Sequence, residues 1–341
     1  METTTIAVDA MGGYGGPEPV VRAVGRLSLQ RRADDADVYF VLVGDEARIG
    51  ELLVQCRHNP ERLSVVHAPH WVRPSEPARE GLHAHPEASI TQACRLVASR
   101  EADAVVTTGH PGAAVVSALH HFGMIPGIPK AALAAVFPTP RPEDGRRFSL
   151  ILDVGATVRA SADDLVKFAL MGSAYARIIS GLERPSVGLL SISREPGIGP
   201  AEIVRAHESL RQIEALHFVG NVEGHQIALG EVDVIVCEGF AGDIAIKVLE
   251  GFADAAFAIA EQEYQRKFAY RMGLRLLAEG LKKIKTAVDF EEYGGAPLLG
   301  IDRVLIVADP RSGSRAVENA VKLALKSVRA ELPTAIAAML R

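Results

Sequence analysis

The sequence predicts an α/β protein with a Rossmann-like, mostly parallel β-sheet covered by helices. Short runs rich in Val, Ile and Leu alternate with longer helical patterns along the 341 residues, and these runs show no clean polar alternation. Runs of this kind are typical of strands buried on both faces of a parallel sheet. Their alternation with helical segments indicates a doubly wound architecture.

The expected strands are residues 5–9, 38–43, 63–67, 104–107, 132–137, 149–154, 186–192, 216–219, 232–237 and 304–307. The expected helices are residues 19–29, 89–99, 162–179 and 314–339. We find no internal repeat and no low-complexity linker. The prediction is therefore a single α/β domain over residues 1–341, with a basic amphipathic helical insertion at about residues 257–286.

Composition limits the class of protein. The apolar content of 48% and charged content of 23% are ordinary for a globular protein, and the net charge of −5 argues against broad nucleic-acid binding. Cys56, Cys94 and Cys237 are scattered without metal-ligand spacing, which favours reduced thiols in a cytoplasmic protein. Cys237 lies in an apolar run and is expected in the core. The first residues do not resemble a signal peptide. The sequence contains no run of about 18 apolar residues, so no membrane-spanning helix is predicted.

Several predicted strands end in loops of small residues. In open α/β sheets, ligands bind outside the carboxyl ends of strands, where glycine lets the backbone approach a ligand and helix N-termini favour phosphate. The loops match neither a dinucleotide fingerprint nor a P-loop. Glycine also forms ordinary turns, so a single loop of this kind would be weak evidence for a ligand site. The residues expected to bind substrate or phosphate are Asp9, Gly12, Gly13, Gly109, His110, Gly112, Gly155, Gly239 and Gly242.

Longer motifs make the pattern specific. They include IAVDAMGGYGGPEPVVRAV from residue 6, LVGDE from 42, PGIPKAAL from 126, LDVGA from 152, MGSAYA from 171, GLERPSVGLL from 181, FVGNVEG from 218, CEGFAGDIAIKVLEG from 237 and YGGAPLLG from 293. In this order, over nearly the whole chain, they resemble the bacterial acyl-ACP:phosphate acyltransferase family. The resemblance implies a fold related to the phosphotransacetylase and isocitrate dehydrogenase-like proteins, a homodimer, and acyl transfer from acyl-ACP to inorganic phosphate without a cofactor, metal or covalent nucleophile.

The motifs also suggest catalytic residues. Lys247, in the DIAIKVLEG segment, is expected in the first turns of a helix, either as a cationic contact to phosphate or the thioester oxygen, or as a solvated helix lysine. Asn221 and Glu223 either orient substrate or form a turn. Asp153, like Asp9, closes a buried strand, so catalysis and the capping of a helix or loop are both open.

The sequence departs from the family pattern at polar positions. Tyr14 replaces an acid, Thr157 replaces an asparagine, the segment 191–200 lacks a lysine, Asp309 stands in the place of a histidine motif, and His110 replaces an asparagine. A lost buried hydrogen bond often costs ~1–3 kcal/mol. Two alternatives therefore stay open: a catalytically degenerate paralogue that binds acyl-ACP or a protein partner, and a phosphate acyltransferase that uses acyl-CoA.

A basic segment spans residues 266–285, with apolar residues at helical spacing. It predicts a basic amphipathic helix, which suits an anionic membrane surface, an acidic carrier protein, or packing with a solvated basic face. The resemblance favours peripheral contact with the inner face of the membrane. The residues expected to make membrane or carrier contact are Arg266, Lys267, Arg271, Arg275, Lys282 and Lys283.

Overall fold

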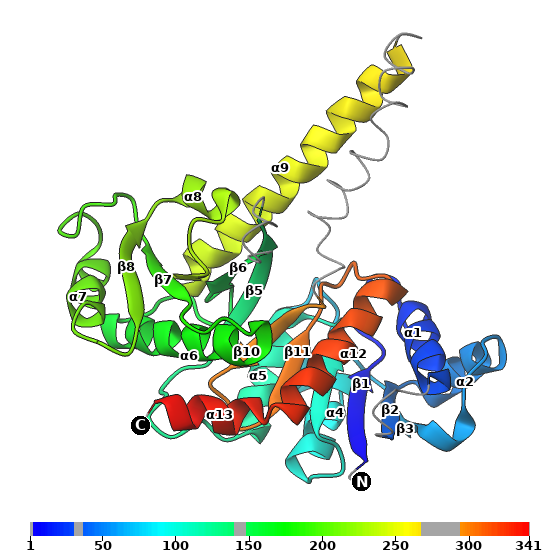
Figure 1. Ribbon diagram of the computed structural model, residues 1–341. Coiled ribbons are helices and arrows are strands. Elements are labelled where there is room, and N and C mark those ends of the chain that lie inside the picture. The colour runs from blue at the N-terminus through cyan, green and yellow to red at the C-terminus, as the bar shows by residue number, and fades with distance from the viewer. Residues whose placement is uncertain (1–2, 31–36, 140–147, 267–293, 341) are drawn as a thin grey trace. The chain divides into compact units, whose positions relative to one another are not determined.

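The computed structural model describes residues 3–30, 37–139, 148–266 and 294–340 (Figure 1). The chain divides into two compact units. The first contains Met1–Ala135, Ala174–Glu183 and Glu291–Arg341, and the second contains Val136–Ser173 and Arg184–Phe290. Strand β5 (Ala132–Pro138) and helix α6 (Ala162–Ser180) contribute residues to both units.

The sheet of the first unit has the order β3-β2-β1-β4-β11-β10-β5. Its further strands are β1 (Thr4–Asp9), β2 (Val38–Gly44), β3 (Leu63–His67), β4 (Ala104–Thr107), β10 (Ala296–Leu299) and β11 (Val304–Val307). Strand β10 runs antiparallel to both of its neighbours, whereas the other pairs are parallel. Parallel register places Asp9 opposite Thr107, and Thr107 opposite Val307, so these three strands end at one edge.

Helices of the first unit cover this sheet. They are α1 (Glu18–Leu29), α2 (Glu46–Val54), α3 (Ala78–Ala84), α4 (Ser89–Ala98), α5 (Pro111–His121), α12 (Ser314–Arg329) and α13 (Leu332–Met339), with a short 3-10 turn at Pro60–Arg62. Val20 and Val24 of α1 and Val317 and Val321 of α12 join one core cluster with Ile6 of the central strand β1. The i, i+4 spacing in both helices explains why each buries a single face.

The second unit contains a parallel sheet in the order β6-β9-β7-β8. Its strands are β6 (Phe148–Leu152), β7 (Ser186–Leu190), β8 (His217–Val222) and β9 (Val234–Val236). Its helices, besides part of α6, are α7 (Ala201–Leu210), α8 (Gly224–Leu229) and α9 (Gly239–Arg266). Helix α9 begins just after β9 and extends well past the sheet of this unit (Figure 1).

The predicted fold class is confirmed, and the expected strands agree with the structure to within a few residues. The sequence analysis missed β10, whose APLL segment contains Pro297; proline cannot donate to a strand ladder and lowers the strand signal. The single helix predicted over 314–339 is wrong. The chain leaves α12 through Glu331, which has a positive φ of 44°, and starts α13 with Pro333 in its first turn.

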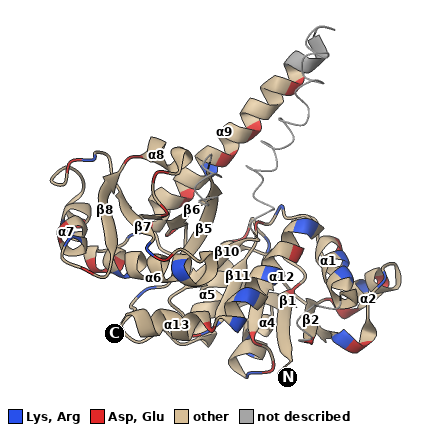
Figure 2. Cartoon of the chain, in the orientation of Figure 1, with Lys and Arg blue, Asp and Glu red and all other residues tan. Residues whose placement is uncertain are grey.

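Charged residues are mixed over the surface, with acidic and basic side chains interspersed on both units (Figure 2). Among the described helices, none combines the length and hydrophobicity that crossing a bilayer requires.

Candidate active site

In the first unit, the candidate residues lie at the carboxyl ends of β1 and β4. Asp9 is almost fully buried, and it accepts hydrogen bonds from the Thr107 hydroxyl at 2.8 Å and from the Met11 amide at 3.2 Å. Thr107 in turn accepts a bond from the Gly109 amide at 2.9 Å. Burial raises the pKa of the Asp9 carboxyl above its ordinary value, although the bond from Thr107 opposes this shift. Asp9 thus connects two strands that are far apart in sequence.

The glycines of these loops allow the loops to approach one another. A Cβ on Gly12 would lie 2.5 Å from the Gly109 Cα, and a Cβ on Gly13 would lie 3.3 Å from the Pro310 carbonyl oxygen. The Tyr14 amide donates to the same carbonyl at 2.8 Å. Close packing of the loops after β1, β4 and β11 therefore requires Gly12, and phosphate binding by these glycines stays a prediction.

His110 caps helix α5. Its Nδ1 accepts a hydrogen bond from the Ala113 amide at 3.3 Å, which satisfies one of the free amides at the helix start. A Cβ on Gly112 would lie 3.0 Å from the His110 ring. The asparagine that the family resemblance implies at this position would offer the same kind of N-cap acceptor.

In the second unit, Asp153 follows β6 and is fully buried. Its Oδ1 accepts from the amides of Gly155 and Ala156 at 3.1 and 3.0 Å. Its Oδ2 accepts from the Thr157 amide at 2.7 Å and the Thr157 hydroxyl at 2.8 Å. The carboxylate therefore organises its own loop, and Thr157 supplies a side-chain donor where the family resemblance implies an asparagine.

Helix α9 starts directly against this loop. A Cβ on Gly239 would lie 2.0 Å from the Thr157 carbonyl oxygen, and a Cβ on Gly242 would lie 1.9 Å from the Asp153 carbonyl oxygen. The Cys237 thiol donates to the same Asp153 oxygen at 3.3 Å, and burial followed by the charge of Asp153 raises the pKa of this thiol. Cys237 is thus a buried core residue, as the sequence predicted.

Asn221 lies near the end of β8 and is also buried. Its Oδ1 lies 2.8 Å from Nδ1 of His207, and its Nδ2 donates to the carbonyls of Ser193 and Glu195, each at 3.3 Å. These contacts hold the loop after β7 in place. Asn221 can therefore influence substrate through that loop, and direct substrate contact stays a prediction.

Glu223 and Lys247 have more solvent around them. Glu223 stands at the start of α8, where its amide donates to Oε1 of Gln226 at 2.9 Å. Lys247 is the ninth residue of the 28-residue helix α9, so it lies in the early turns of a helix, as the sequence predicted. Its Nζ lies 2.7 Å from Oδ2 of Asp243, and its side chain is 68% exposed. The lysine is thus available to an anion that displaces an exposed carboxylate.

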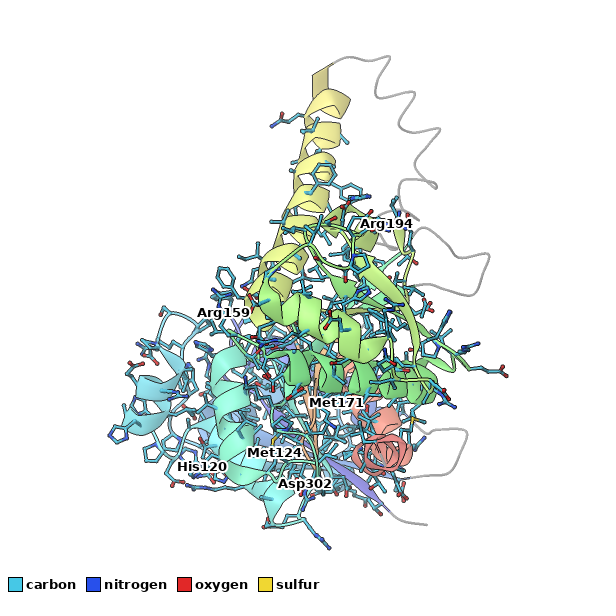
Figure 3. The ribbon with its side chains drawn as sticks, turned by 90° about the vertical axis from the view of Figure 1, so that its left-hand side faces the viewer. His120, Met124, Arg159, Met171, Arg194 and Asp302 are labelled. Atoms are coloured by element: carbon cyan, nitrogen blue, oxygen red, sulfur yellow. The ribbon has the colours of Figure 1, made fainter. Side chains whose placement is uncertain are left out.

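A cavity of about 390 Å³ opens beside the loops after β6, β7 and β9. At its edge, Nη1 of Arg159 lies 3.1 Å from Oε1 of Glu238, and Arg159 stands near the base of α9 (Figure 3). Sequence analysis missed this cavity because its walls come from segments far apart in the chain. The lining residues are Arg159, Ala160, Leu165, Leu190, Ser191, Ile192, Pro200, Glu202, Ile203, Cys237, Glu238 and Ala241.

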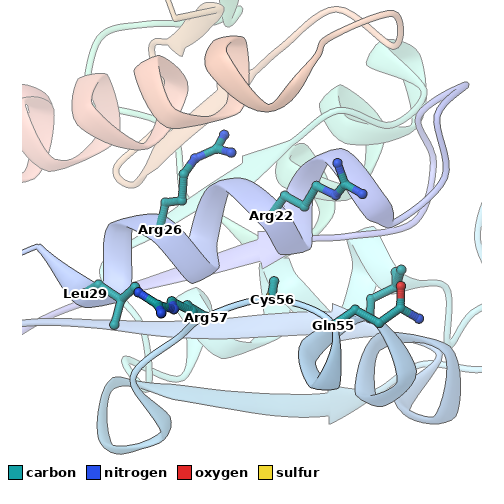
Figure 4. A pocket seen from close by; sticks show the side chains of 7 residues that line it. Arg22, Arg26, Leu29, Gln55, Cys56 and Arg57 are labelled. Carbon is teal, nitrogen blue, oxygen red and sulfur yellow. The ribbon is translucent and has the colours of Figure 1, made fainter.

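The first unit contains a basic cavity of about 380 Å³ between α1 and the end of α2 (Figure 4). Arg22, Arg26 and Arg57 line it. Arg22 is paired with Glu18 at 2.7 Å and Arg26 with Glu318 at 2.6 Å. These pairs offset much of the positive charge, so the cavity is a weaker candidate for an anion site than the arginine content alone indicates.

The basic residues expected to contact a membrane or a carrier lie almost entirely outside the described part of the chain, from residue 267 onward. Arg266 is the last residue of α9.

Comparison with known proteins first defines the class. The solved structure of a phosphotransacetylase from Streptococcus pyogenes superposes with a TM-score of 0.63 at 15% identity, covering 96% of this chain and 94% of that chain. The EutD phosphotransacetylase from Staphylococcus aureus gives 0.60 at 15% identity, covering 96% of this chain and 94% of that one. The chain therefore has the fold of phosphotransacetylases.

Sequence comparison then gives the family. The family model "Fatty acid synthesis protein" matches residues 4–334. A phosphate acyltransferase from Moorella thermoacetica is 39% identical over 331 residues, which is 97% of this chain and 94% of the relative. A phosphate acyltransferase from Nitratidesulfovibrio vulgaris (strain DP4) is 37% identical over 324 residues, or 95% and 91% of the two chains. The chain belongs to the phosphate acyltransferase family of fatty acid synthesis proteins.

Proposed function

We propose that this protein transfers a fatty acyl group from acyl-ACP to inorganic phosphate and so supplies acyl phosphate for phospholipid synthesis. The observation that carries the proposal is the family match over residues 4–334 together with relatives at 37–39% identity over at least 95% of the chain. Membership makes the protein an acyltransferase with phosphate as acceptor. The carrier-bound donor rests on the resemblance of the sequence motifs.

The reaction sets the demands on the site. A phosphate oxygen attacks the thioester carbonyl carbon, a C–O bond forms, the C–S bond breaks, and the sulfur leaves with a proton as the carrier thiol. The site must hold an anion, aim it at the carbonyl, and stabilise the developing oxyanion. No enzyme nucleophile is needed, and the buried thiols of Cys94 and Cys237 are consistent with direct transfer.

Lys247 is the proposed cationic contact to phosphate or the thioester oxygen. It lies on the helix that begins at the loop of Asp153, and its ion pair with Asp243 is exposed. An exposed pair contributes about 0–1 kcal/mol, so a phosphate dianion can replace Asp243 at small cost. Asp153, Asn221 and Glu223 then act by fixing the neighbouring loops, and backbone amides of the glycine-rich strand ends contribute donors.

Homodimer formation and peripheral membrane contact are further proposals that rest on the resemblance and on the basic segment 266–285. Attraction of this segment to anionic lipid is electrostatic and is therefore weakened by salt. We expect the protein to float with anionic vesicles at low salt and to be released at high salt. Failure to float at any salt concentration would leave carrier docking or plain packing as the role of this segment.

The test of the function is an assay with palmitoyl-ACP and phosphate, in which acyl phosphate is trapped by hydroxylamine. We expect phosphate-dependent product, and a fall of about 10-fold or more for Lys247→Ala, as expected for loss of a charged contact to the transition state. The matched control is Lys322→Ala on α12, an exposed lysine that bonds Oδ1 of Asn319 at 3.2 Å; its activity stays unchanged.

Each of the other outcomes selects an alternative. Absence of product from protein that still binds acyl-ACP identifies a binding paralogue. Equal or greater turnover of palmitoyl-CoA overturns the assignment of acyl-ACP as the donor. Equal loss in both lysine variants removes Lys247 from the proposed site.

A further inference from the structure

The cavity of the second unit is lined largely by apolar side chains, which favour an apolar ligand. Leu165 of α6, Leu190 of β7, Ile203 of α7 and Ala241 of α9 form much of its lining. Its volume of about 390 Å³ lies within the ~300–1,000 Å³ typical of small-molecule sites. These residues come from separate elements that converge at the carboxyl ends of parallel strands, which is where ligands bind in open α/β sheets.

The carboxylates in the lining already have partners within the protein. Oε2 of Glu202 accepts from the Ala162 amide at 2.8 Å, and Glu238 is paired with Arg159 at 3.1 Å. A ligand rich in amides or hydroxyls would compete with these bonds, and burying a polar group without a partner is costly. A hydrocarbon chain requires no such exchange.

The hydroxyl and thiol groups in the lining also have hydrogen-bond partners within the protein. The Ser191 hydroxyl donates to the Ile198 carbonyl at 3.3 Å, and the Cys237 thiol donates to the Asp153 carbonyl at 3.3 Å. The cavity therefore combines satisfied polar groups with apolar walls. Ile192 also lines the cavity and is 76% exposed, so the apolar lining continues to the protein surface.

We infer that this cavity holds the hydrocarbon chain of the acyl donor, and that Ile203 and Ala241 set the chain length it accepts. The inference rests on the proposed function and adds to it a subsite for a saturated acyl chain, as opposed to the polar carrier arm. Its position beside the fixed loop of Asp153 keeps the chain near the strand ends, where the thioester carbonyl has to meet phosphate.

The activity test changes the cavity volume from both directions. Ile203→Phe and Ala241→Leu reduce the space, whereas Ile203→Ala enlarges it. We expect the filling variants to lower kcat/KM for palmitoyl-ACP by about 10-fold while hexanoyl-ACP changes less than twofold, because one or two methylene groups lose their burial. The matched control is Leu229→Phe at the end of α8, an exposed position in the same unit outside the cavity lining.

If the ratio of kcat/KM for palmitoyl-ACP to kcat/KM for hexanoyl-ACP stayed unchanged in all cavity variants, the subsite would be overturned. The enlarging variant keeps the test informative if a filling variant does not fold, because Ile203→Ala should raise the preference for the longer chain.

A second measurement separates this inference from the proposed function. The wild-type full chain is irradiated with a palmitate analogue that carries a diazirine on its chain, and the labelled peptides are mapped by mass spectrometry. We expect labels within residues 159–165, 190–203 or 237–241, with labelling lowered by Ala241→Leu but not by Leu229→Phe. Labels elsewhere overturn the subsite even if the enzyme is active, whereas these labels in a protein that makes no acyl phosphate retain the subsite and overturn only the catalytic function.

Discussion

The two units use the same sequence signature, a strand-ending aspartate followed by glycines, in different ways. In the first unit, Asp9 bonds to Thr107 on a strand 98 residues away, so the carboxyl joins two strand ends. In the second unit, the Asp153 carboxylate accepts four hydrogen bonds from the loop that directly follows it. The Asp9 carboxyl thus links two strand ends, whereas the Asp153 carboxylate fixes the loop that follows its own strand.

The glycines differ in the same way. Gly12 allows one loop to meet another loop, because its missing Cβ leaves room for Gly109. Gly239 and Gly242 instead let the start of a helix meet a loop backbone. The second arrangement fixes α9 against the wall of an apolar cavity, so we assign the acyl chain to that unit. A strand-end glycine therefore reports close approach, and only the three-dimensional neighbours show what approaches.

The largest expected effect is at the helix start of the second unit. Gly242→Ala places a methyl group 1.9 Å from a backbone oxygen, and we expect a loss of about 3 kcal/mol in the free energy of unfolding. Gly251→Ala on the same helix meets nothing within 4 Å, so it should gain about 0.5–1 kcal/mol. Urea unfolding measures both. A similar effect of the two changes would contradict the close approach.

A pair of threonine variants compares the two acids directly. Thr107→Val removes a donor to Asp9 and an acceptor for the Gly109 amide, and we expect about 2 kcal/mol of destabilisation because a buried amide loses its partner. Thr157→Val removes a hydroxyl donor to Asp153 and a long, 3.4 Å acceptor of the Gly239 amide. Three amide donors to Asp153 remain, so about 1 kcal/mol is expected. Thermal and urea unfolding provide the values; a larger loss at Thr157 would reverse the comparison.

The Asp9 carboxyl also predicts a pH dependence. Its folded pKa lies above the ordinary value of 3.8 because of burial, so its contribution to stability is fully present below that pH and is lost as pH rises through the folded pKa. Asp9→Asn carries no charge at any pH. The stability of this variant relative to wild type should therefore rise as the pH increases through the folded pKa of Asp9. A difference that is constant with pH in urea unfolding would contradict this.

The smallest effect is expected at the cap of α5 in the first unit. His110→Asn retains an acceptor for the Ala113 amide and should change stability by less than about 0.5 kcal/mol, whereas His110→Ala should cost about 1 kcal/mol. Thermal unfolding distinguishes the two. If asparagine were as harmful as alanine, the histidine ring would contribute more than the cap.

Much of the fold was predictable because it is encoded locally. Apolar runs such as those of β4 and β11 identify buried strands without any knowledge of their neighbours. Strand β10 was not predictable in this way, because Pro297 weakens the local signal and pairing on both sides supplies the stability. The break between α12 and α13 had a local signal in Pro333 that the sequence analysis did not use.

The candidate site was predictable in position but not in detail. Asp9 and Asp153 lie at strand ends, and the glycines lie in the loops or first helical turns that follow the strands, as parallel topology requires. Their hydrogen-bond partners depend on which loops meet, and no local pattern specifies that. The cavity was missed for the same reason, since Leu165, Ile203 and Ala241 become neighbours only when separate elements pack together.

The chemical state of Cys237 determines whether the protein can bind reactive acyl thioesters and acyl phosphates without being acylated. Thioesters and acyl phosphates acylate accessible thiolates, and Cys237 lines the cavity proposed for the acyl chain. Its sulfur is buried, donates to a backbone carbonyl and has a raised pKa, so it stays protonated at neutral pH and is a poor nucleophile. The protein can therefore handle an activated acyl group next to a cysteine without modifying itself.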